Sequence, residues 1–379
     1  MTKKALILIF SGIGNAITAL PIIEILSKNN FEVDILVYSN VIKELLSGDP
    51  RINNIYIFNQ EKDIFGNLKL IRSLRNKNYD FAMTIYPSQG IISAFILYLL
   101  NAKIRTQHVC NYLLKFVSMK FKIPIPIRKN IILFEKIFLT YPKKVKEEKH
   151  AIYQMLDLLN PVIQNYQNGL DLKYYLNDDE IRFSERFWHE NNLNDNFVIG
   201  IHTGTSGKPP FKMWDLEYWK QLLLKINEEF DSIKFIAFIG PSEDDHEKYL
   251  KGLELDNLII TKGLSIRETI ALISKCNFFI SADSGLAHCA SLFKIPQIVM
   301  FGPVDYRYIH PFSENCKVVT PDNYKPFYVP HCGFISKPYN CMKDLKPEKV
   351  FKEFEEYLKE LNIKIDLKGR YDEDRNYFR

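Results

Sequence analysis

The stretch ISADSGLAHCASLFKIPQIVMFGPVD, residues 280–305, carries the most specific pattern in this chain. An apolar run ends at Asp283, Ser284 and Gly285 supply a turn, and a helical pattern begins with His288 one turn inside. A second apolar run, PQIVMFG, follows directly. The order strand, helix, strand is typical of a parallel sheet with a crossover helix. Free backbone N–H groups at the start of such a helix favour an anion.

The side chains of this turn predict how an anionic substrate is held. The Ser284 hydroxyl and the small Gly285 let a diphosphate approach the backbone, and Asp283 is placed to bind sugar or ribose hydroxyls. His288 points back toward the same turn, where its ring can donate to a phosphate. The alternative is that Asp283 and Ser284 only cap the helix. The pattern by itself leaves both interpretations open.

Strand-like and helix-like segments alternate on both sides of this stretch. The strand-like segments are 5–10, 31–38, 54–58 and 81–87 in the first half, and 196–202, 233–240, 257–261, 277–282 and 296–302 in the second. Such alternation predicts parallel strands joined by right-handed crossovers. Ser265 and Glu268 form a predicted capping box that starts one of the helices.

A chain of 379 residues is long enough for two domains. We expect an α/β protein with a Rossmann-like domain over 1–165, a bridge over 166–195 and a second Rossmann-like domain over 196–350. A C-terminal helix and tail over 351–379 complete the predicted organisation.

Composition predicts an ordinary globular protein, with 46% hydrophobic and 25% charged residues. The apolar run at 91–100 is about half the length of a spanning helix and predicts a buried helix. The N-terminus lacks a small-residue cleavage site, which favours the cytoplasm. Six scattered cysteines predict reduced, buried thiols, with a pair between Cys332 and Cys341 as the alternative.

The net charge of +5 is unevenly distributed along the chain. Residues 103–149 hold twelve Lys and Arg against three Glu, interleaved with apolar residues. This pattern favours a surface that faces an anionic membrane or an anionic glycolipid. A solvated basic face without a partner is the alternative. No nucleic-acid-binding module is recognisable, so nucleic acid is not an expected partner.

The 280–305 stretch resembles the signature of glycosyltransferase family 9, the bacterial heptosyltransferases that build the inner core of lipopolysaccharide. Three other stretches resemble the same family in the same order: GIGNAITALPIIEIL (12–26), YLLNAKIR (98–105) and HTGTSGKPPFKMWDLEYWKQLL (202–223). The tail CMKDLKPEKVFKEF (341–354) also fits. The resemblance implies a GT-B fold, two Rossmann-like domains facing a cleft. The N-terminal half would bind the acceptor and the C-terminal half the nucleotide sugar.

The resemblance also implies a reaction: inverting, metal-independent transfer of heptose from ADP-heptose to a lipopolysaccharide or lipooligosaccharide core or a related glycan. A different nucleotide sugar is the alternative donor. No cofactor is implied beyond this nucleotide-sugar substrate, and no metal site is expected. The only literal D-x-D motif, Asp372 to Asp374, lies in a charged tail where solvation is expected. The enzyme is expected in the cytoplasm, peripheral at the inner face of the inner membrane.

Donor-binding residues carry over from the family by position. The residues at the positions that contact the diphosphate are Thr205, Ser206, Lys212, Ser284 and Gly285. Lys212 also has a catalytic role, because it neutralises the leaving group. Asp283 and His288 are the other predicted donor-binding residues of the turn. Glu243 matches the loop near the nucleoside only loosely, and Ser242 with Asp245 can instead cap a helix. His202 and Thr203 can simply finish a strand. Gly302 and Pro303 shape a turn before Asp305, which is assigned to the donor sugar.

Asn15 departs from the family pattern. An inverting transfer needs a base for the acceptor hydroxyl, and the family places an aspartate directly after the second glycine of the loop formed here by Ser11, Gly12 and Gly14. A carboxamide has no useful basicity near neutral pH.

Three explanations of this departure remain open. Another group, among Glu61, Asp63, Asp80 and His108, can serve as the base. Alternatively the proton passes late to solvent or phosphate while Asn15 orients the hydroxyl, or the protein binds sugar nucleotide and transfers weakly or not at all. A dinucleotide-binding loop is disfavoured, because Ile17 occupies the third glycine position and Asp34 lies inside a strand pattern.

Overall fold

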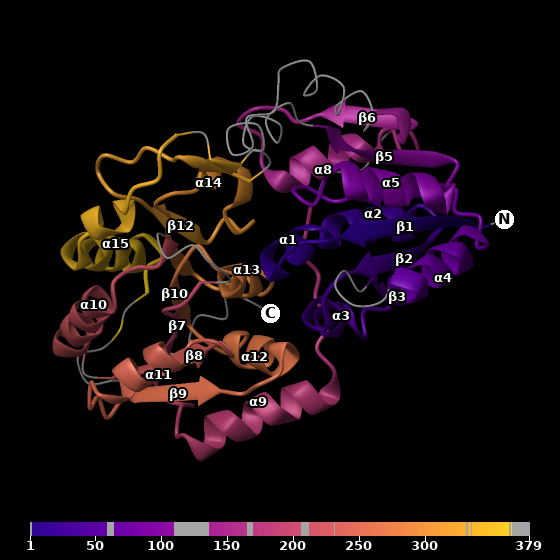
Figure 1. Cartoon of the computed structure of the whole chain (residues 1–379). Helices are drawn as coiled ribbons and strands as arrows, with labels where there is room; N and C mark the ends of the chain where they lie inside the picture. The colour runs from indigo at the N-terminus through magenta and orange to yellow at the C-terminus, as the bar shows by residue number, and fades with distance from the viewer. Residues whose placement is uncertain are drawn as a thin grey trace. The chain divides into compact units, whose positions relative to one another are not determined.

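The computed structural model describes residues 2–58, 64–109, 136–164, 170–205, 212–230, 232–330, 333–334, 336–363 and 365 (Figure 1). The chain forms two compact units. Unit 1 comprises Met1–Tyr175, Arg307–Ile309 and Phe327–Lys337, and unit 2 comprises Leu176–Tyr306, His310–Pro326 and Pro338–Arg379. Each unit contains a six-stranded parallel sheet covered by helices, which confirms the predicted architecture of two α/β domains.

The sheet of unit 1 has the strand order β3-β2-β1-β4-β5-β6. Its strands are β1 (Lys3–Ile9), β2 (Phe31–Val37), β3 (Ile52–Ile57), β4 (Phe81–Thr84), β5 (Ile104–Val109) and β6 (Tyr141–Lys144). Its helices are α1 (Ile13–Thr18), α2 (Leu20–Lys28), α3 (Asn40–Leu46), α4 (Ile64–Arg75), α5 (Ile91–Leu100) and α8 (Ala151–Leu159). The fully buried run at the end of β1 explains its central place, because a strand covered on both faces has no solvent side.

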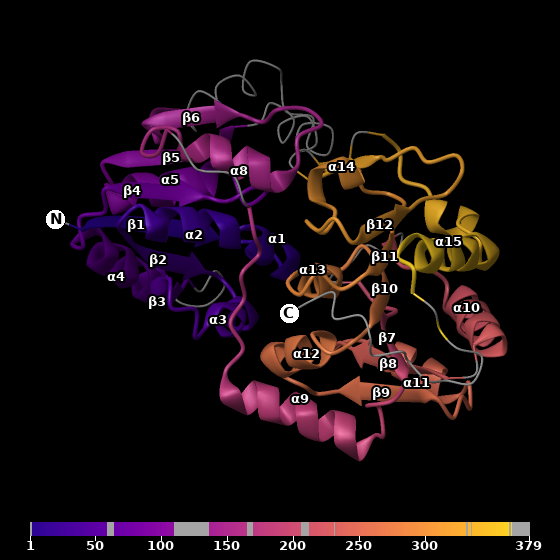
Figure 2. The same cartoon turned by 180° about the vertical axis from the view of Figure 1, so that it is seen from behind.

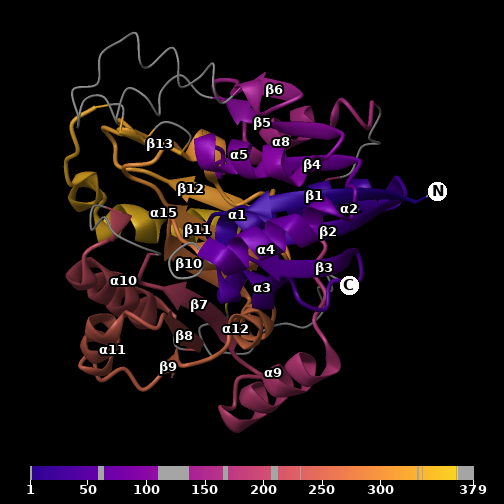
Figure 3. The same cartoon turned by 45° about the vertical axis from the view of Figure 1, so that its right-hand side comes forward.

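The helices of unit 1 cover both faces of this sheet. The chain first winds from β1 to β3 and then crosses back past β1 to β4. Right-handed crossovers in these two directions place α2 and α3 on one face and α4 and α5 on the other. Helices α4 and α5 pack side by side on their face (Figure 3), and α2 packs against α8 (Figure 2).

The sheet of unit 2 repeats this topology with the order β12-β11-β10-β7-β8-β9. Its strands are β7 (Phe197–His202), β8 (Ile233–Ile239), β9 (Leu258–Lys262), β10 (Phe278–Ala282), β11 (Gln297–Met300) and β12 (Cys316–Val319). The helices after residue 176 are α9 (Asp178–Glu190), α10 (Leu216–Glu229), α11 (Asp244–Lys251), α12 (Ile266–Ile273), α13 (Gly285–Ser291), α14 (Tyr306–Ile309) and α15 (Pro347–Glu360). The 3-10 helix η2 (Cys341–Asp344) also belongs to unit 2. The antiparallel pair β13 (Tyr328–Val329) and β14 (Gly333–Phe334) lies in the Phe327–Lys337 part of unit 1.

Aromatic packing and helix caps hold unit 2 together. Phe278 of β10 meets Phe354 of α15 edge to face, with the ring centroids 5.1 Å apart. The predicted capping box of Ser265 and Glu268 is confirmed. A second capping box at Asn177 starts α9, and its Glu180 carboxylate also accepts from the Arg267 guanidinium of α12 at 2.9 Å. This buried ion pair links α9 to α12. Removing either partner would leave an unpaired charge in the interior, which would be costly.

Both sheets have a topological switch point. In unit 1 the chain leaves β1 toward β2 on one side and reaches β4 on the other, and in unit 2 β7 lies between β8 and β10 in the same way. Ligands of such sheets bind at the carboxyl ends of the strands that flank this point. The loops after β1 and β4, and after β7 and β10, are therefore where a site is expected.

Other expectations meet mixed outcomes. Residues 91–100 do form a helix, but the prediction that it is buried is wrong for one face, where Ile92 and Phe95 are exposed. Cys276, Cys289 and Cys341 are buried free thiols, as predicted, whereas Cys316 is a free thiol that is only partly buried. Cys110 and Cys332 lie outside the described residues. Within the described part of the chain, no helix is long and apolar enough to cross a membrane.

Candidate functional site

Lys212 and Asp283 form an ion pair beside the turn that follows β10. The Lys212 Nζ lies 2.8 Å from Asp283 Oδ2, and both side chains are mostly buried. Asp283 is the residue after β10, and its backbone N–H donates to the Met300 carbonyl of β11. The two residues are 71 positions apart in sequence, so the fold brings the loop after β7 to the loop after β10.

The turn itself is a helix start. Ser284 is the N-cap of α13, and its Oγ accepts from the Ala287 N–H at 3.4 Å. The capping alternative therefore describes Ser284, whereas the Asp283 carboxylate is turned to Lys212. Gly285 is the first residue of the helix.

His288 lies one turn inside α13, as predicted, and is buried. Burial lowers the pKa of His288 to about 4; Asp283 opposes this shift, and His310 and Lys212 add to it. Its Nδ1 has no hydrogen-bond partner among the described residues. The ring is therefore neutral at pH 7 and can donate from only one nitrogen.

The lowered pKa of His288 gives a prediction for stability. The unfolded chain binds a proton on this histidine near pH 6.5, and the folded chain does so only near pH 4. Stability therefore falls as the pH drops through this window, by on the order of 2 kcal/mol from this group. In urea titrations at pH 7 and pH 4.5, His288→Gln is expected to lose less unfolding free energy than the unsubstituted chain.

The control for this prediction is His189→Gln, which changes an exposed histidine of α9. This variant should follow the unsubstituted chain at both pH values. An equal loss of stability in His288→Gln and in the unsubstituted chain would contradict the assignment of a neutral, buried His288.

Glu243 is held between the ends of β7 and β8. The His202 Nε2 lies 3.3 Å from Glu243 Oε1, and the Gly240 N–H donates to Oε2 at 2.7 Å. Burial opposes ionisation, but the hydrogen bonds from His202 and Gly240 keep the pKa of Glu243 below its usual value. Glu243 is also the residue at the N-cap of α11, so Ser242 does not occupy that position. A partly exposed, ionised carboxylate at this place is an acceptor for hydroxyl groups.

The remaining residues after β7 are polar and buried. The Thr203 Oγ1 is 2.9 Å from the His246 Nδ1, and burial lowers the pKa of His246. The Thr205 Oγ1 is buried without a partner among the described residues, and Ser206 lies outside them. His246 was not predicted, although its position is similar to that of His288: both lie within the first four residues of the helix that follows a strand-end loop.

The loop after β11 is shaped by close packing. A Cβ at Gly302 would lie 2.5 Å from Met342 Sδ and 2.9 Å from Cys341 Sγ, so only glycine fits without a shift. Asp305, the predicted donor-sugar residue, is buried.

The glycine loop of unit 1 leads straight into α1. Gly12 is the N-cap, with an ordinary φ of −73°, and Gly14 and Asn15 lie in the first turn. The Asn15 side chain is half-buried. The Ser11 Oγ is buried and finds no partner in the described part of the chain.

A second polar loop follows β4, the neighbour of β1. The Ser88 Oγ and the Gln89 Oε1 are buried without a partner among the described residues, and Gly90 starts α5. Unpaired buried polar atoms are costly and are usually satisfied by water or a ligand. Neither residue was predicted. The signal was their place after a strand at the switch point, which becomes visible only once the strand order is known.

Two candidate bases can be placed. Asp80 precedes β4, so it lies at the amino end of the sheet, at the edge opposite Asn15. There it accepts from Lys103 Nζ at 2.7 Å and from the Lys4 N–H at 2.9 Å, which excludes it as the base. His108 is fully buried within β5. Glu61 and Asp63 lie outside the described residues.

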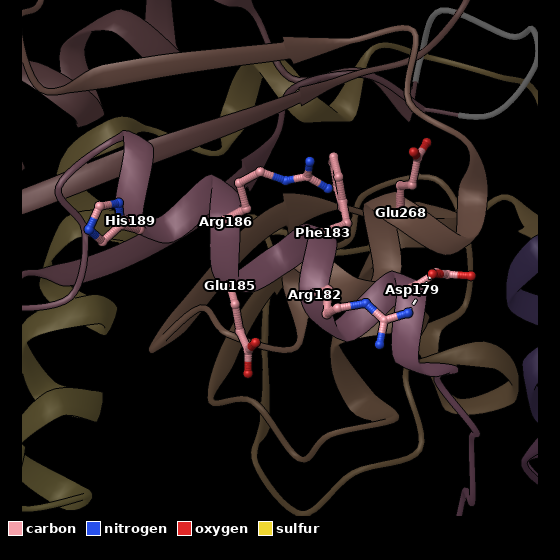
Figure 4. A pocket seen from close by; sticks show the side chains of 7 residues that line it. All are labelled: Asp179, Arg182, Phe183, Glu185, Arg186, His189 and Glu268. Atoms are coloured by element: carbon pink, nitrogen blue, oxygen red, sulfur yellow. Dashed lines mark hydrogen bonds and ion pairs between the residues drawn. The ribbon is translucent and has the colours of Figure 1, made fainter.

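A charged pocket lies elsewhere, along α9 and beside the start of α12 (Figure 4). It is lined by Asp179, Arg182, Phe183, Glu185, Arg186, His189 and Glu268. Its lining comes from helices α9 and α12 and from none of the strand-end loops, so it is not the candidate site. In the ranges that the structure describes, no three His, Cys, Asp or Glu side chains are grouped to hold a metal ion.

Two Rossmann-like units with polar loops at their switch points define a two-domain protein of the doubly wound α/β class. The chain belongs to glycosyltransferase family 9 (heptosyltransferase), whose family model matches residues 67–329. It is 27% identical over 230 residues to lipooligosaccharide heptosyltransferase 2 of Campylobacter jejuni serotype O:2, covering 59% of this chain and 68% of that relative.

Solved structures show the same fold. The family 9 glycosyl transferase of Veillonella parvula matches with a TM-score of 0.74 at 17% identity, over 94% of this chain and 97% of that one. The Escherichia coli ADP-heptose lipopolysaccharide heptosyltransferase II matches with a TM-score of 0.71 at 16% identity, over 95% and 99%. The protein is thus a glycosyltransferase with the GT-B fold, as the sequence predicted.

Proposed function

We propose that this glycosyltransferase moves heptose from ADP-heptose to a lipopolysaccharide or lipooligosaccharide core, or to a related glycan. In this proposal the transfer inverts the anomeric centre and needs no metal ion. The observation that carries it is the polar lining of the loops after β7 and β10, at the switch point of unit 2, and of the neighbouring loop after β8. Family membership and the resemblance to lipooligosaccharide heptosyltransferase 2 support the choice of sugar and acceptor.

The proposed donor site divides into two parts. Lys212, the start of α13 and the Thr205 hydroxyl, which has no partner among the described residues, bind the diphosphate, whose negative charge grows as it leaves. Glu243 accepts hydrogen bonds from the ribose, since its carboxylate is ionised and fixed by His202 and Gly240. Asp283 orients Lys212, and the neutral His288 donates one hydrogen bond to the phosphate side. Ser206 belongs to the predicted donor set but lies outside the described residues.

Gly204 gives this donor site a sharp test. A Cβ at this position would lie 1.7 Å from Glu243 Oε1, so Gly204→Ala must displace the carboxylate from His202. Losing one hydrogen bond to a charged group should raise the KM for ADP-heptose about ten-fold. The measurement is the donor dependence of ADP release. Gly252→Ala, whose Cβ meets nothing closer than 3.3 Å, is the matched control, and equal KM values in the two variants would count against the role of Glu243.

The proposed acceptor side is the switch point of unit 1. Ser11, Gly12 and Gly14 form its loop, and Asn15 lies in the first turn of α1. Ser88 and Gln89 add polar atoms that have no partner in the described part of the chain. Such atoms suit a sugar, which presents hydroxyl groups as both donors and acceptors. The acceptor oxygen attacks the anomeric carbon, the bond to the diphosphate breaks, and the hydroxyl proton must leave. Asn15 orients this hydroxyl but does not take its proton.

The proposed location is the cytoplasm, peripheral at the inner face of the inner membrane, where a glycolipid acceptor would be exposed. The basic segment 103–149 is proposed to face the anionic acceptor or membrane, although its residues 110–135 lie outside the described ones. Nucleic acid is not a proposed partner.

The test is a transfer assay with ADP-heptose and lipooligosaccharide truncated before its heptoses. Release of ADP together with a product heavier by one heptose is the expected result. The anomeric configuration of the product reports inversion, and unchanged rates in a chelator report metal independence. Tight binding of ADP-heptose without turnover on any acceptor, including the native glycan, would contradict transfer. It would favour a sugar-nucleotide-binding protein, the alternative that follows from asparagine at position 15 in place of the expected base. Turnover with only another nucleotide sugar would correct the donor.

A further inference from the structure

Helices α4 and α5 expose large apolar side chains on adjacent surfaces of unit 1. On α4, Phe65 is 85% exposed and Ile64 is 76% exposed, and Leu68 follows one turn later. On α5, Ile92 is 68% exposed and Phe95 is 45% exposed. The two helices pack side by side on one face of the sheet (Figure 3). We call Ile64, Phe65, Leu68, Ile91, Ile92 and Phe95 the α4/α5 apolar surface; contiguous surfaces of this kind usually mark an interaction site.

The segments around this surface carry an excess of cations. Residues 64–79, 90–109 and 136–146 contain ten Lys and Arg and no Asp or Glu. Three of these cations, Lys77, Lys103 and Lys146, pair with carboxylates of other segments, whereas no ion pair is found for Lys69 or Arg72 among the described residues. Lys69 and Arg72 are exposed on α4, one turn and two turns after Phe65, so they lie on the same side of the helix. Apolar side chains beside cations with long flexible stems suit a bilayer with anionic headgroups. A surface for another protein would not need this excess of cations.

The topology sets where this surface lies in unit 1. Both helices follow parallel strands and run back along the sheet, so each begins at the carboxyl edge. Ile64 and Phe65 begin α4, and Ile91 and Ile92 begin α5. The α4/α5 apolar surface therefore lies at the same edge as Ser88 and Gln89, which directly precede α5.

We propose that the α4/α5 apolar surface docks on an anionic lipid bilayer, with Lys69 and Arg72 contacting the headgroups. Docking would present the loop of Ser88 and Gln89 to a glycan whose lipid anchor lies in that bilayer. This last step rests on the proposed function, whereas the docking itself does not. No residue from 110–135 is needed for it.

The test is co-sedimentation of the full chain with vesicles of phosphatidylglycerol and phosphatidylethanolamine, compared with phosphatidylcholine vesicles. The chain is expected to bind the anionic vesicles, and binding should weaken as salt is raised. Phe65→Gln combined with Ile92→Gln should weaken this binding about ten-fold, because both side chains leave the bilayer interface. Lys69→Glu combined with Arg72→Glu should abolish it. All four side chains are exposed, so folding should be retained.

The matched control is Val41→Gln combined with Ile181→Gln, which changes exposed apolar residues of α3 and α9; it should bind within two-fold of the unsubstituted chain. Equal vesicle binding by the Phe65/Ile92 variant and the control, or no binding by the unsubstituted chain, would overturn the proposal. A concentration-dependent dimer that only the Phe65/Ile92 variant loses would also overturn it, since a second copy would then be the occupant. ADP release with a water-soluble acceptor should be unchanged in all variants, so a failure of docking is distinguishable from a failure of transfer.

Discussion

Replacing Lys212 with alanine is expected to lower kcat/KM for ADP-heptose by about 100-fold or more. The Lys212 ammonium is the cation fixed at the turn before α13, where the leaving diphosphate is proposed to gain charge. Removing one fixed group that stabilises developing charge typically costs 100-fold to 1,000-fold in rate. The effect should fall mainly on kcat, because the charge to be stabilised is larger in the transition state than in the bound donor. Initial rates of ADP release over a range of donor concentrations measure both constants.

The ion pair with Asp283 makes this prediction more specific. Asp283→Asn keeps a hydrogen-bond acceptor near Lys212 but removes the charge, so a loss of about ten-fold is expected. If Asp283 acts by orienting Lys212, the double variant should be no worse than Lys212→Ala alone, since interacting sites are not additive. Lys220→Ala, which removes a more exposed lysine of α10, is the control. A Lys212→Ala rate within two-fold of this control would remove Lys212 from the mechanism.

The fold was predictable because its signals are local. The apolar run of β10, the turn at Ser284 and the helix that follows lie within 278–291 and need no distant partner. The Ser265 capping box was found because its two residues are three positions apart. The box at Asn177 has the same spacing and was equally readable. The role of this box in packing was not predictable from the sequence, since Glu180 also binds Arg267, which is 87 positions away.

The site was predicted as a set of positions but not as a set of contacts. Lys212 and Asp283 were both chosen, yet their pairing depends on β7 and β10 being neighbours in the sheet. Glu243 was matched only loosely to the family's loop near the nucleoside. Its carboxylate occupies space that is open because Gly204 has no side chain. Ser88 and Gln89 were missed because the sequence of a polar loop does not show that the preceding strand, β4, pairs with β1. Pairing across a sheet is a long-range property, which local patterns do not encode.

Replacing Asn15 with aspartate is expected to raise kcat about ten-fold to 100-fold. The change is nearly isosteric, and it puts a carboxylate in the first turn of α1, where the positive end of the helix favours a negative charge. A positioned base typically raises the reaction rate 100-fold to 10,000-fold. Asn15→Asp should recover part of this factor if the Asn15 carboxamide already orients the acceptor hydroxyl. The gain requires the ionised carboxylate, so it should be present above the aspartate pKa, near 4, and vanish as the pH falls through that value.

Asn15→Ala separates orientation from proton transfer. It removes the hydrogen bond that the carboxamide makes in the proposal, so kcat should fall while the KM for ADP-heptose stays the same, because the donor-binding residues belong to unit 2. Rates of ADP release from pH 4 to pH 9 for the three proteins are the measurement. Equal kcat values for asparagine, aspartate and alanine would show that residue 15 does not touch the reacting hydroxyl. A lower kcat in both Asn15→Asp and Asn15→Ala would contradict the predicted gain from a base at residue 15. It would show that transfer needs the carboxamide, which can donate as well as accept a hydrogen bond.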